Sequence, residues 1–392
     1  MDRRDFLVAS GLGIAAANAP AAAMRPEGAA ARPNASRKPL LMKLGCQSGP
    51  SSDEHFAFFA RYGLRNISAT APAGEGRAYS TVEELQALKD MANCHGLSLD
   101  MIDTVLLPSS NIDRERHPAI MLADSPERDR DIEAFQTSIR NAARVGIPCV
   151  KYNMSILGVL RSGTVKGRGD AVYTRWNLAE AKPSKPLTRA GVVDADRFWE
   201  RITYFLDRVV PVANEYKVRI ACHPQDPGVP KSGYMGVDRV LGTVAGLQRF
   251  VSYKDSPYHG LNFCQGTISE DLRDPNREID DVIRWFGTRK KIFNVHFRNI
   301  RGGRDNFTEV FPDEGDVDFV RVLQVYREVG YDGMLMPDHV PQVPGTPDPT
   351  RTTVGNPDFE RLARGDPGAG LASFAFAYGY IRGLLQSAER LS

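Results

Sequence analysis

The chain has 392 residues, of which 42% are hydrophobic and 25% charged, and its formal net charge is +2. This is ordinary globular composition. The near-neutral charge, without a basic stripe interleaved with aromatic residues, argues against nucleic acid as a partner. The five cysteines have no CxxC spacing, so they predict neither a disulfide scaffold nor a zinc knuckle.

The N-terminus "MDRRDFLVASGLGIAAANAPAAAM" has the layout of a twin-arginine export signal: paired arginines, a short apolar run and small residues. The apolar run is too short and too rich in alanine for a membrane span. We predict a signal peptide and disordered spacer over 1–38, a single folded domain over 39–392, and a periplasmic location. This route carries folded proteins, often with a cofactor already loaded, so a cofactor site is expected in the folded domain.

Short apolar runs alternate with amphipathic ones after residue 40. In "TVEELQALKDMANCHG", for example, Val82, Leu85, Leu88 and Met91 recur at helical spacing and Gly96 ends the segment. Eight strands are predicted, over 39–46, 64–70, 97–107, 148–156, 218–224, 260–266, 292–300 and 333–340. Eightfold strand–helix alternation predicts a TIM (β/α)8 barrel. An open doubly wound sheet is the alternative, but no glycine-rich phosphate motif follows the first strand.

Two segments interrupt this alternation. The first, 157–193, follows the fourth strand, and the second, rich in proline, runs over 341–370 after the eighth. The first segment is interpreted either as a lid or as a solvated surface excursion. A lid would suit an anionic substrate, because the segment carries cations that include Arg161, Lys166, Arg168 and Arg175.

Four side chains of metal-ligand type lie in or directly after four consecutive predicted strands: His223, Cys264, His296 and Asp338. Barrel enzymes keep their chemistry at the mouth where these strand ends meet. Two imidazoles, a thiolate and a carboxylate favour Mn²⁺, Fe²⁺, Co²⁺ or Zn²⁺ over Mg²⁺ or Ca²⁺. The remaining cysteines and histidines are interpreted as structural.

The motifs that carry these residues, "HPQDP", "NFCQGT", "VHFRNI" and "PDHV", resemble in order those of the mannonate dehydratase family, metal-dependent barrels related to xylose isomerase-like enzymes. The resemblance runs through about 39–340 and into the final helix. It implies that the four residues bind one divalent ion, Mn²⁺ or Fe²⁺, with Zn²⁺ or Co²⁺ as alternatives. It further implies that His339 transfers protons. The residues expected to meet the substrate are Arg298, Tyr152, Asn153, Asp226 and Glu309.

The chain also departs from the family pattern. After "YN" it reads "MSILGVLRSG" in place of a segment containing Trp-Thr-Arg, and Gln225 replaces an acid. Ala372 stands where the family has a tyrosine tied to catalysis. The metal ligands are therefore expected to be retained, and the surroundings of the substrate to have changed.

These observations predict a lyase that dehydrates a sugar acid, D-mannonate or a related aldonate or uronate, to a 2-keto-3-deoxy acid. The ion would stabilise the enediolate, His339 would act as acid and base, and Arg298 would clamp the substrate carboxylate. Alternatives are a metal-dependent sugar isomerase or epimerase, a carbon–carbon lyase, and a non-catalytic periplasmic protein that binds sugar acids. The predicted partner is a small anionic or polyhydroxylated substrate. The sequence is compatible with a homo-oligomer but does not predict one.

Overall fold

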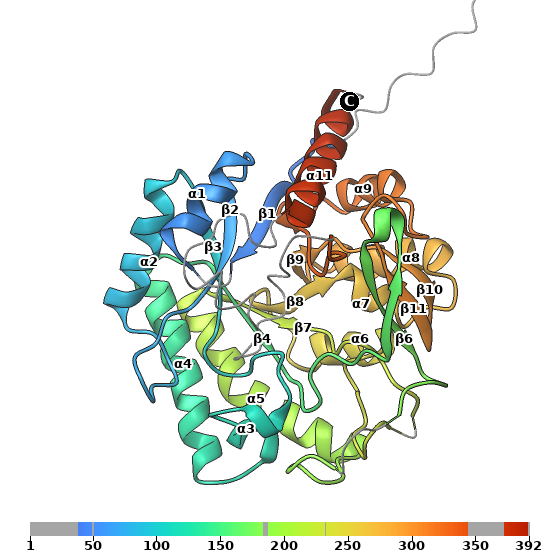
Figure 1. The fold of residues 1–392 in the computed structure, drawn as a ribbon. Coiled ribbons are helices and arrows are strands. Elements are labelled where there is room, and N and C mark those ends of the chain that lie inside the picture. The colour runs from blue at the N-terminus through green and yellow to red at the C-terminus, as the bar shows by residue number, and fades with distance from the viewer. Residues whose placement is uncertain (1–37, 49–50, 183–186, 232, 344–371, 391–392) are drawn as a thin grey trace, which may run out of the picture. The chain divides into compact units, whose positions relative to one another are not determined.

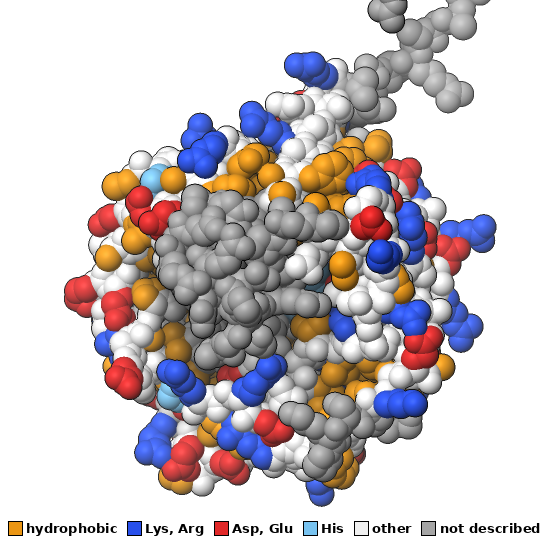
Figure 2. All heavy atoms as spheres, viewed as in Figure 1, with side chains coloured by type: hydrophobic (Ala, Val, Ile, Leu, Met, Phe, Trp, Pro, Cys, Tyr) orange, Lys and Arg blue, Asp and Glu red, His pale blue; other side chains and the backbone are white. Residues whose placement is uncertain are grey.

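The computed structural model describes residues 38–48, 51–182, 187–231, 233–343 and 372–390. The predicted leader and most of the predicted insertion 341–370 lie outside these ranges. Within the described part, no helix combines the length and apolar character needed to cross a membrane. Lysine and arginine side chains are interspersed with acidic ones over the face drawn in Figure 2.

Eight parallel strands form a closed barrel in the order β1-β12-β9-β8-β7-β4-β3-β2, which confirms the predicted TIM barrel. β1 pairs with both β2 and β12 and so closes the ring. Each strand overlaps one predicted run, although most are shorter. The bounds are β1 Lys43–Ser48, β2 Asn66–Thr70, β3 Ser98–Asp103, β4 Cys149–Asn153, β7 Arg219–His223, β8 His259–Cys264, β9 Ile292–His296 and β12 Met334–Met336.

The helices surround the barrel (Figure 1). α2 illustrates why they form where they do: the Thr81 side chain and Glu84 make a capping box at its start, and Leu85 and Leu88 lie on its buried face. The longer helices are α1 Asp53–Arg61, α2 Val82–Cys94, α4 Glu127–Val145, α5 Ala195–Tyr216, α6 Val244–Tyr253, α8 Pro275–Thr288, α9 Phe319–Glu328 and α11 Ala372–Arg390. Two short helices are α3 Ala119–Leu122 and α7 Gln265–Ser269.

The apolar core has two main parts. A large cluster fills the layer between strands and helices, and a small one occupies the barrel interior. The interior cluster consists of Met101, Cys149, Ala221, Phe293, Met334 and Met336. Most of these residues lie in the first half or at the middle of a strand. The polar residues at the carboxyl ends of the strands therefore form the mouth of the barrel.

A second sheet is built from the two connections that leave the barrel after β4 and β9. It contains β5 Gly163–Lys166, β6 Val172–Asn177, β10 Ile300–Gly303 and β11 Asn306–Glu309, in the antiparallel order β10-β11-β6-β5. Trp176 of β6 packs with Ile300 and Phe307 to give this sheet its own apolar cluster. Within the segment 157–193, residues 163–166 and 172–177 are thus strands of a folded sheet, and the predicted strand 292–300 is a barrel strand followed by the start of β10.

Candidate active site

The four predicted metal ligands meet at the barrel mouth. His223, Cys264 and His296 are the last residues of β7, β8 and β9, and Asp338 follows β12 by two residues. One ligand atom from each lies within 4.8 Å of the other three. Parallel neighbouring strands place their last side chains at the same edge, which is why residues so far apart in sequence converge.

The two imidazoles are oriented by their other ring nitrogens. Nδ1 of His223 lies 2.6 Å from the carbonyl oxygen of Pro224, so it carries the proton and Nε2 keeps its lone pair. Burial lowers the pKa of His223 to about 4, and the ring is therefore neutral at pH 7. In His296, Nε2 lies 3.0 Å from the Asn262 side-chain amide, and the buried Nδ1 has no hydrogen-bond partner among the described residues.

The thiol and the carboxylate complete the group. The Thr267 amide and hydroxyl donate to Sγ of Cys264 over 3.4 and 3.1 Å and so fix the position of the sulfur. Burial opposes ionisation of Asp338, but His339 and His296 outweigh it and hold the pKa of the carboxyl well below its usual range. Two nitrogens, one sulfur and one ionised oxygen fit a divalent transition metal. Nδ1 of His296 makes no hydrogen bond among the described residues and lies 3.4 Å from Oδ2 of Asp338, as expected of two atoms that face one ion.

A second charged cluster adjoins these ligands, with Asp226, Glu309 and His339 close enough to share one centre. Arg298 lies at its middle: its guanidinium is 2.9 Å from Asp226 and 3.3 Å from Asp338 and also contacts Glu309. Nδ1 of His339 lies 2.6 Å from Oε1 of Glu309. The side chains predicted for proton transfer and for substrate contact, Tyr152 excepted, thus lie beside the predicted metal ligands.

The charges in this cluster set its protonation. Burial opposes protonation of His339, yet the carboxylates of Asp338 and Glu309 raise its pKa to about 10. Burial likewise opposes ionisation of Glu309, but Arg161 and His339 lower its pKa below the usual range. At neutral pH the pair is therefore an imidazolium beside a carboxylate.

Tyr152 is not brought to the site, and its predicted substrate contact is wrong. Its ring packs between β4 and the helices, with centroids 5.3 Å from Phe135 and 5.4 Å from Phe205. Successive residues of a strand point to opposite faces, so Asn153 reaches the mouth beside His223 while Tyr152 points outward.

Of the four cations predicted to form a basic lid, Arg161 reaches the site. It forms ion pairs with Asp226 and Glu309 and lies 3.5 Å from Glu270. The other three pair with acids nearer the surface: Lys166 with Asp170, Arg168 with Asp313 and Arg175 with Glu180. The predicted basic lid therefore contributes one guanidinium.

Gln225 and Ala372, two of the departures from the family pattern, differ in the contacts that they make. The Gln225 amide accepts from the Leu241 backbone and donates to the Met154 carbonyl, each over 2.9 Å, so it braces the loop after β7. Ala372 is the exposed first residue of α11, and the residues directly before it lie outside the described part.

Sequence reasoning missed three polar residues at the site. Glu270, one residue after α7, is buried, and its carboxylate lies 2.6 Å from Arg298. Burial, reinforced by Asp226, raises the pKa of Glu270 well above its usual range. Gln47 and Lys151 meet inside the barrel, 3.0 Å apart. The alternation of β4, which puts Lys151 on the same face as Asn153, was the signal that could have identified the lysine.

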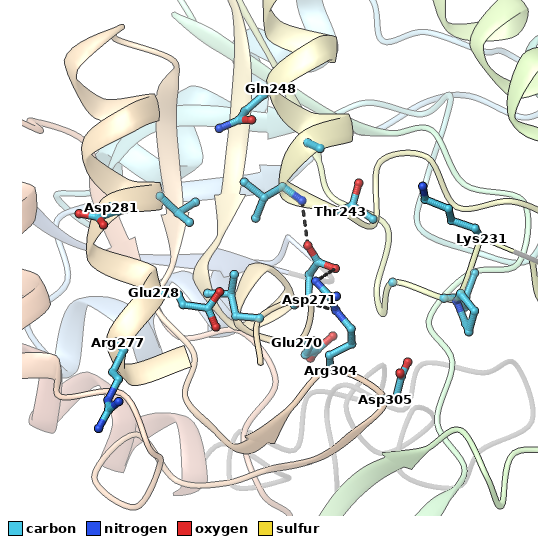
Figure 3. A pocket seen from close by; sticks show the side chains of 17 residues that line it. Lys231, Thr243, Gln248, Glu270, Asp271, Arg277, Glu278, Asp281, Arg304 and Asp305 are labelled. Carbon is cyan, nitrogen blue, oxygen red and sulfur yellow. Dashed lines mark hydrogen bonds and ion pairs between the residues drawn. The ribbon is translucent and has the colours of Figure 1, made fainter. Parts of the chain in front are cut away.

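A separate cavity of about 750 Å³ lies on the outer side of Glu270, between α6 and α8 (Figure 3). Its lining includes cations, such as Arg277 and Arg304, and acids, such as Asp271 and Glu278. Arg304 and Asp271 pair with each other at 3.3 Å. This mixture favours no particular class of ligand.

Comparison with known proteins gives a consistent result. The family model described as D-mannonate dehydratase (UxuA) matches residues 174–391. A mannonate dehydratase of Shouchella clausii is 30% identical, covering 72% of this chain and 87% of the relative. That of Thermotoga petrophila is 28% identical over 79% of this chain and 87% of its own length.

Solved structures agree at the level of the fold. The mannonate dehydratase from Streptococcus suis serotype2 superposes with a TM-score of 0.71 and 26% identity, over 89% of this chain and 95% of that one. A xylose isomerase domain protein from Planctomyces limnophilus, 14% identical, gives a TM-score of 0.53 over 88% and 98%. At that identity the second similarity concerns the barrel alone.

Proposed function

Because this chain belongs to the mannonate dehydratase family, we propose that it dehydrates a sugar acid, D-mannonate or a related aldonate or uronate, to a 2-keto-3-deoxy acid. The observation that carries the proposal is the convergence of His223, Cys264, His296 and Asp338 beside the imidazolium of His339. Family membership favours this reaction over isomerisation, epimerisation or carbon–carbon cleavage on the same barrel.

The reaction removes the proton α to the carboxylate and expels the β-hydroxyl as water; the resulting enol takes a proton at the β-carbon to give the keto acid. Both steps are slow unaided, since the proton is weakly acidic and hydroxide is a poor leaving group. A divalent ion bound by the four ligands would supply Lewis-acid polarisation of substrate oxygens. We propose Mn²⁺ or Fe²⁺, with Zn²⁺ or Co²⁺ as alternatives.

His339 is suited to protonate the departing hydroxyl. Its Nδ1 is engaged by Glu309, and its Nε2 lies 3.9 Å from Oδ1 of Asp338, on the side of the metal ligands. With a pKa of about 10, the ring begins as an acid, and after donating its proton it can accept the next one. Glu309 would hold the ring in this orientation throughout.

Arg161 is better suited than Arg298 to bind the substrate carboxylate. Both guanidinium groups contact the carboxylates of Asp226, Glu270 and Glu309, but the Arg298 side chain is only 1% exposed. Arg161 is 14% exposed and joins the cluster from the connection that leads into the second sheet. We therefore assign the carboxylate clamp to Arg161 and a structural role to Arg298.

The export proposal is independent of the chemistry. We propose a periplasmic location from the twin-arginine layout of the leader, residues 1–24. Comparing periplasmic and cytoplasmic fractions of cells that express the full chain, with and without Arg3→Lys and Arg4→Lys, tests it. Loss of the periplasmic pool in the double variant is expected.

The catalytic assignment is tested with His339→Ala protein loaded with Mn²⁺. Turnover of D-mannonate and related acids, followed by mass spectrometry for loss of one water, should fall by about 10²–10⁴-fold while the metal content is kept. His117→Ala removes a histidine that pairs with Asp131 away from the site and should behave as wild type.

Three results would count against the proposal. Undiminished turnover by His339→Ala would remove that residue from the mechanism. A product of unchanged mass would indicate an isomerase or epimerase. Binding of sugar acids by metal-loaded wild-type protein without any turnover would indicate a binding protein.

A further inference from the structure

A chain of hydrogen-bonded side chains leads away from the carboxylate of Asp338. Oδ2 of this carboxylate faces the other metal ligands, 3.4 Å from Nδ1 of His296 and 3.5 Å from Sγ of Cys264. Oδ1 instead accepts from Nε2 of Gln47 over 3.3 Å. The two oxygens of Asp338 thus have different partners.

The chain continues across the barrel. Nζ of Lys151, on β4, donates to Oε1 of Gln47, on β1, over 3.0 Å. The same ammonium lies 2.9 Å from Asp103 on β3, and the Ser68 hydroxyl on β2 donates to that carboxylate over 3.0 Å. Lys151 is 7% exposed. Four strands therefore support one oxygen of Asp338, and the proposed chemistry uses none of these four side chains.

The lysine determines which way the glutamine points. An amide has one accepting end and one donating end, and an ammonium can only donate. Lys151 therefore fixes the Gln47 oxygen toward itself, and the Gln47 NH₂ group is left facing the Asp338 carboxylate. A reversed amide would present its oxygen to a carboxylate and repel it.

Because Arg298 lies close to Asp338, the hydrogen bond at Oδ1 affects where the carboxylate points. Its Nε lies 3.3 Å from Oδ2 of Asp338, the oxygen that faces the metal ligands. A carboxylate released at Oδ1 could turn toward this guanidinium. Holding Oδ1 therefore keeps Oδ2 directed at the position of an ion.

We propose that Gln47 and Lys151 are positioning residues of the metal centre, with Lys151 acting through Gln47 to orient Asp338. The inference rests on the proposed function, since it requires an ion held by the four ligands. Groups that orient ligand side chains typically change metal affinity by 10–100-fold.

Calorimetric titration of the metal-stripped full chain with Mn²⁺ tests the inference. Gln47→Met and Lys151→Met keep side-chain length and remove the hydrogen bonds, and each should raise the dissociation constant about 10–100-fold. Because Lys151 acts through Gln47, the double variant should bind no more weakly than Gln47→Met alone. Lys166→Met, on β5 and 82% exposed, is the matched control and should bind as wild type.

A second readout separates positioning from general damage to the fold. The absorption spectrum of the Co²⁺-loaded protein reports ligand geometry, and it should change in both single variants. Penalties that simply add in the double variant, or single variants that keep wild-type affinity and spectrum, would overturn the inference alone. Wild-type protein that binds no Mn²⁺ would overturn the proposed function as well.

Discussion

Arg161 and Arg298 carry the same charge and pair with the same three carboxylates, but their side chains differ in exposure, 14% against 1%. Arg298 also lies 3.3 Å from Asp338, so removing this buried cation leaves four buried carboxylates with less compensation. The Arg161 side chain is 14% exposed and lies nearer the outside. The two residues should therefore fail in different ways when they are replaced.

Arg161→Met should raise KM for the sugar acid at least tenfold, because a charge-assisted contact with the substrate carboxylate is lost, and should leave Mn²⁺ affinity unchanged. Arg298→Met should instead lower the free energy of unfolding by about 3–5 kcal/mol. Steady-state kinetics and urea unfolding separate the two. Arg168→Met, whose partner Asp313 is at the surface, is the control for both. An unchanged KM for Arg161→Met would return the clamp to Arg298.

Single residues also mark the limit of sequence reasoning. His223, Cys264, His296 and Asp338 could be grouped because each stands at a strand end, and a parallel barrel brings strand ends together. Glu270 could not, because an acid after a short helix looks like a surface residue until the fold buries it against Arg298.

At the scale of elements, the second sheet is the feature that the sequence did not predict. β6 pairs with β11, although more than a hundred residues separate them. Strand pairing between two insertions depends on where the barrel places their ends, and no local pattern encodes that. The sheet links the positions of Arg161, which precedes β5, and Glu309, the last residue of β11.

Trp176→Ala should loosen this sheet, because it removes the largest side chain of the cluster with Ile300 and Phe307. Hydrogen exchange should accelerate in β5, β6, β10 and β11 while the barrel strands stay protected, and KM should rise as Arg161 loses its support. Trp285→Ala, a half-buried tryptophan on α8, provides the comparison. Uniform acceleration across the barrel would show that the sheet is not a separate unit of stability.

At the scale of the whole molecule, the barrel was predictable because strand and helix alternate eight times and each helix has one apolar face. What the alternation could not supply is the charge buried at the mouth. The acids there include Asp226, Glu309 and Asp338, and the bases Arg161, Arg298 and His339. Such a cluster ties stability to pH.

The metal-free protein should lose stability at both ends of the pH range. The fold lowers the pKa values of three carboxyl groups, those of Asp226, Glu309 and Asp338. Their contribution to the free energy of unfolding is therefore present above the unfolded pKa of about 4 and declines as the pH falls below it. The pKa of His339 is raised to about 10, so its contribution is present below about pH 6.5 and is lost as pH rises toward 10.

Urea unfolding as a function of pH measures the loss of stability at both low and high pH. In Glu309→Gln the alkaline loss should become shallower, because the imidazolium of His339 loses its closest carboxylate. An alkaline limb identical to that of wild type would show that the pair does not contribute to stability. Glu133→Gln, which removes an exposed acid on α4, should leave the alkaline loss of stability unchanged.

The pairing of β1 with β12 has a consequence for the order of events in the cell. Three of the metal ligands lie on β7, β8 and β9, and Asp338 follows β12; these are the last four strands of the barrel. The barrel closes only when β12 pairs with β1. A ribosome-bound chain that lacks its last strand therefore has neither the fourth ligand nor a closed mouth. A complete metal centre therefore forms only after β12 and Asp338 have been synthesised.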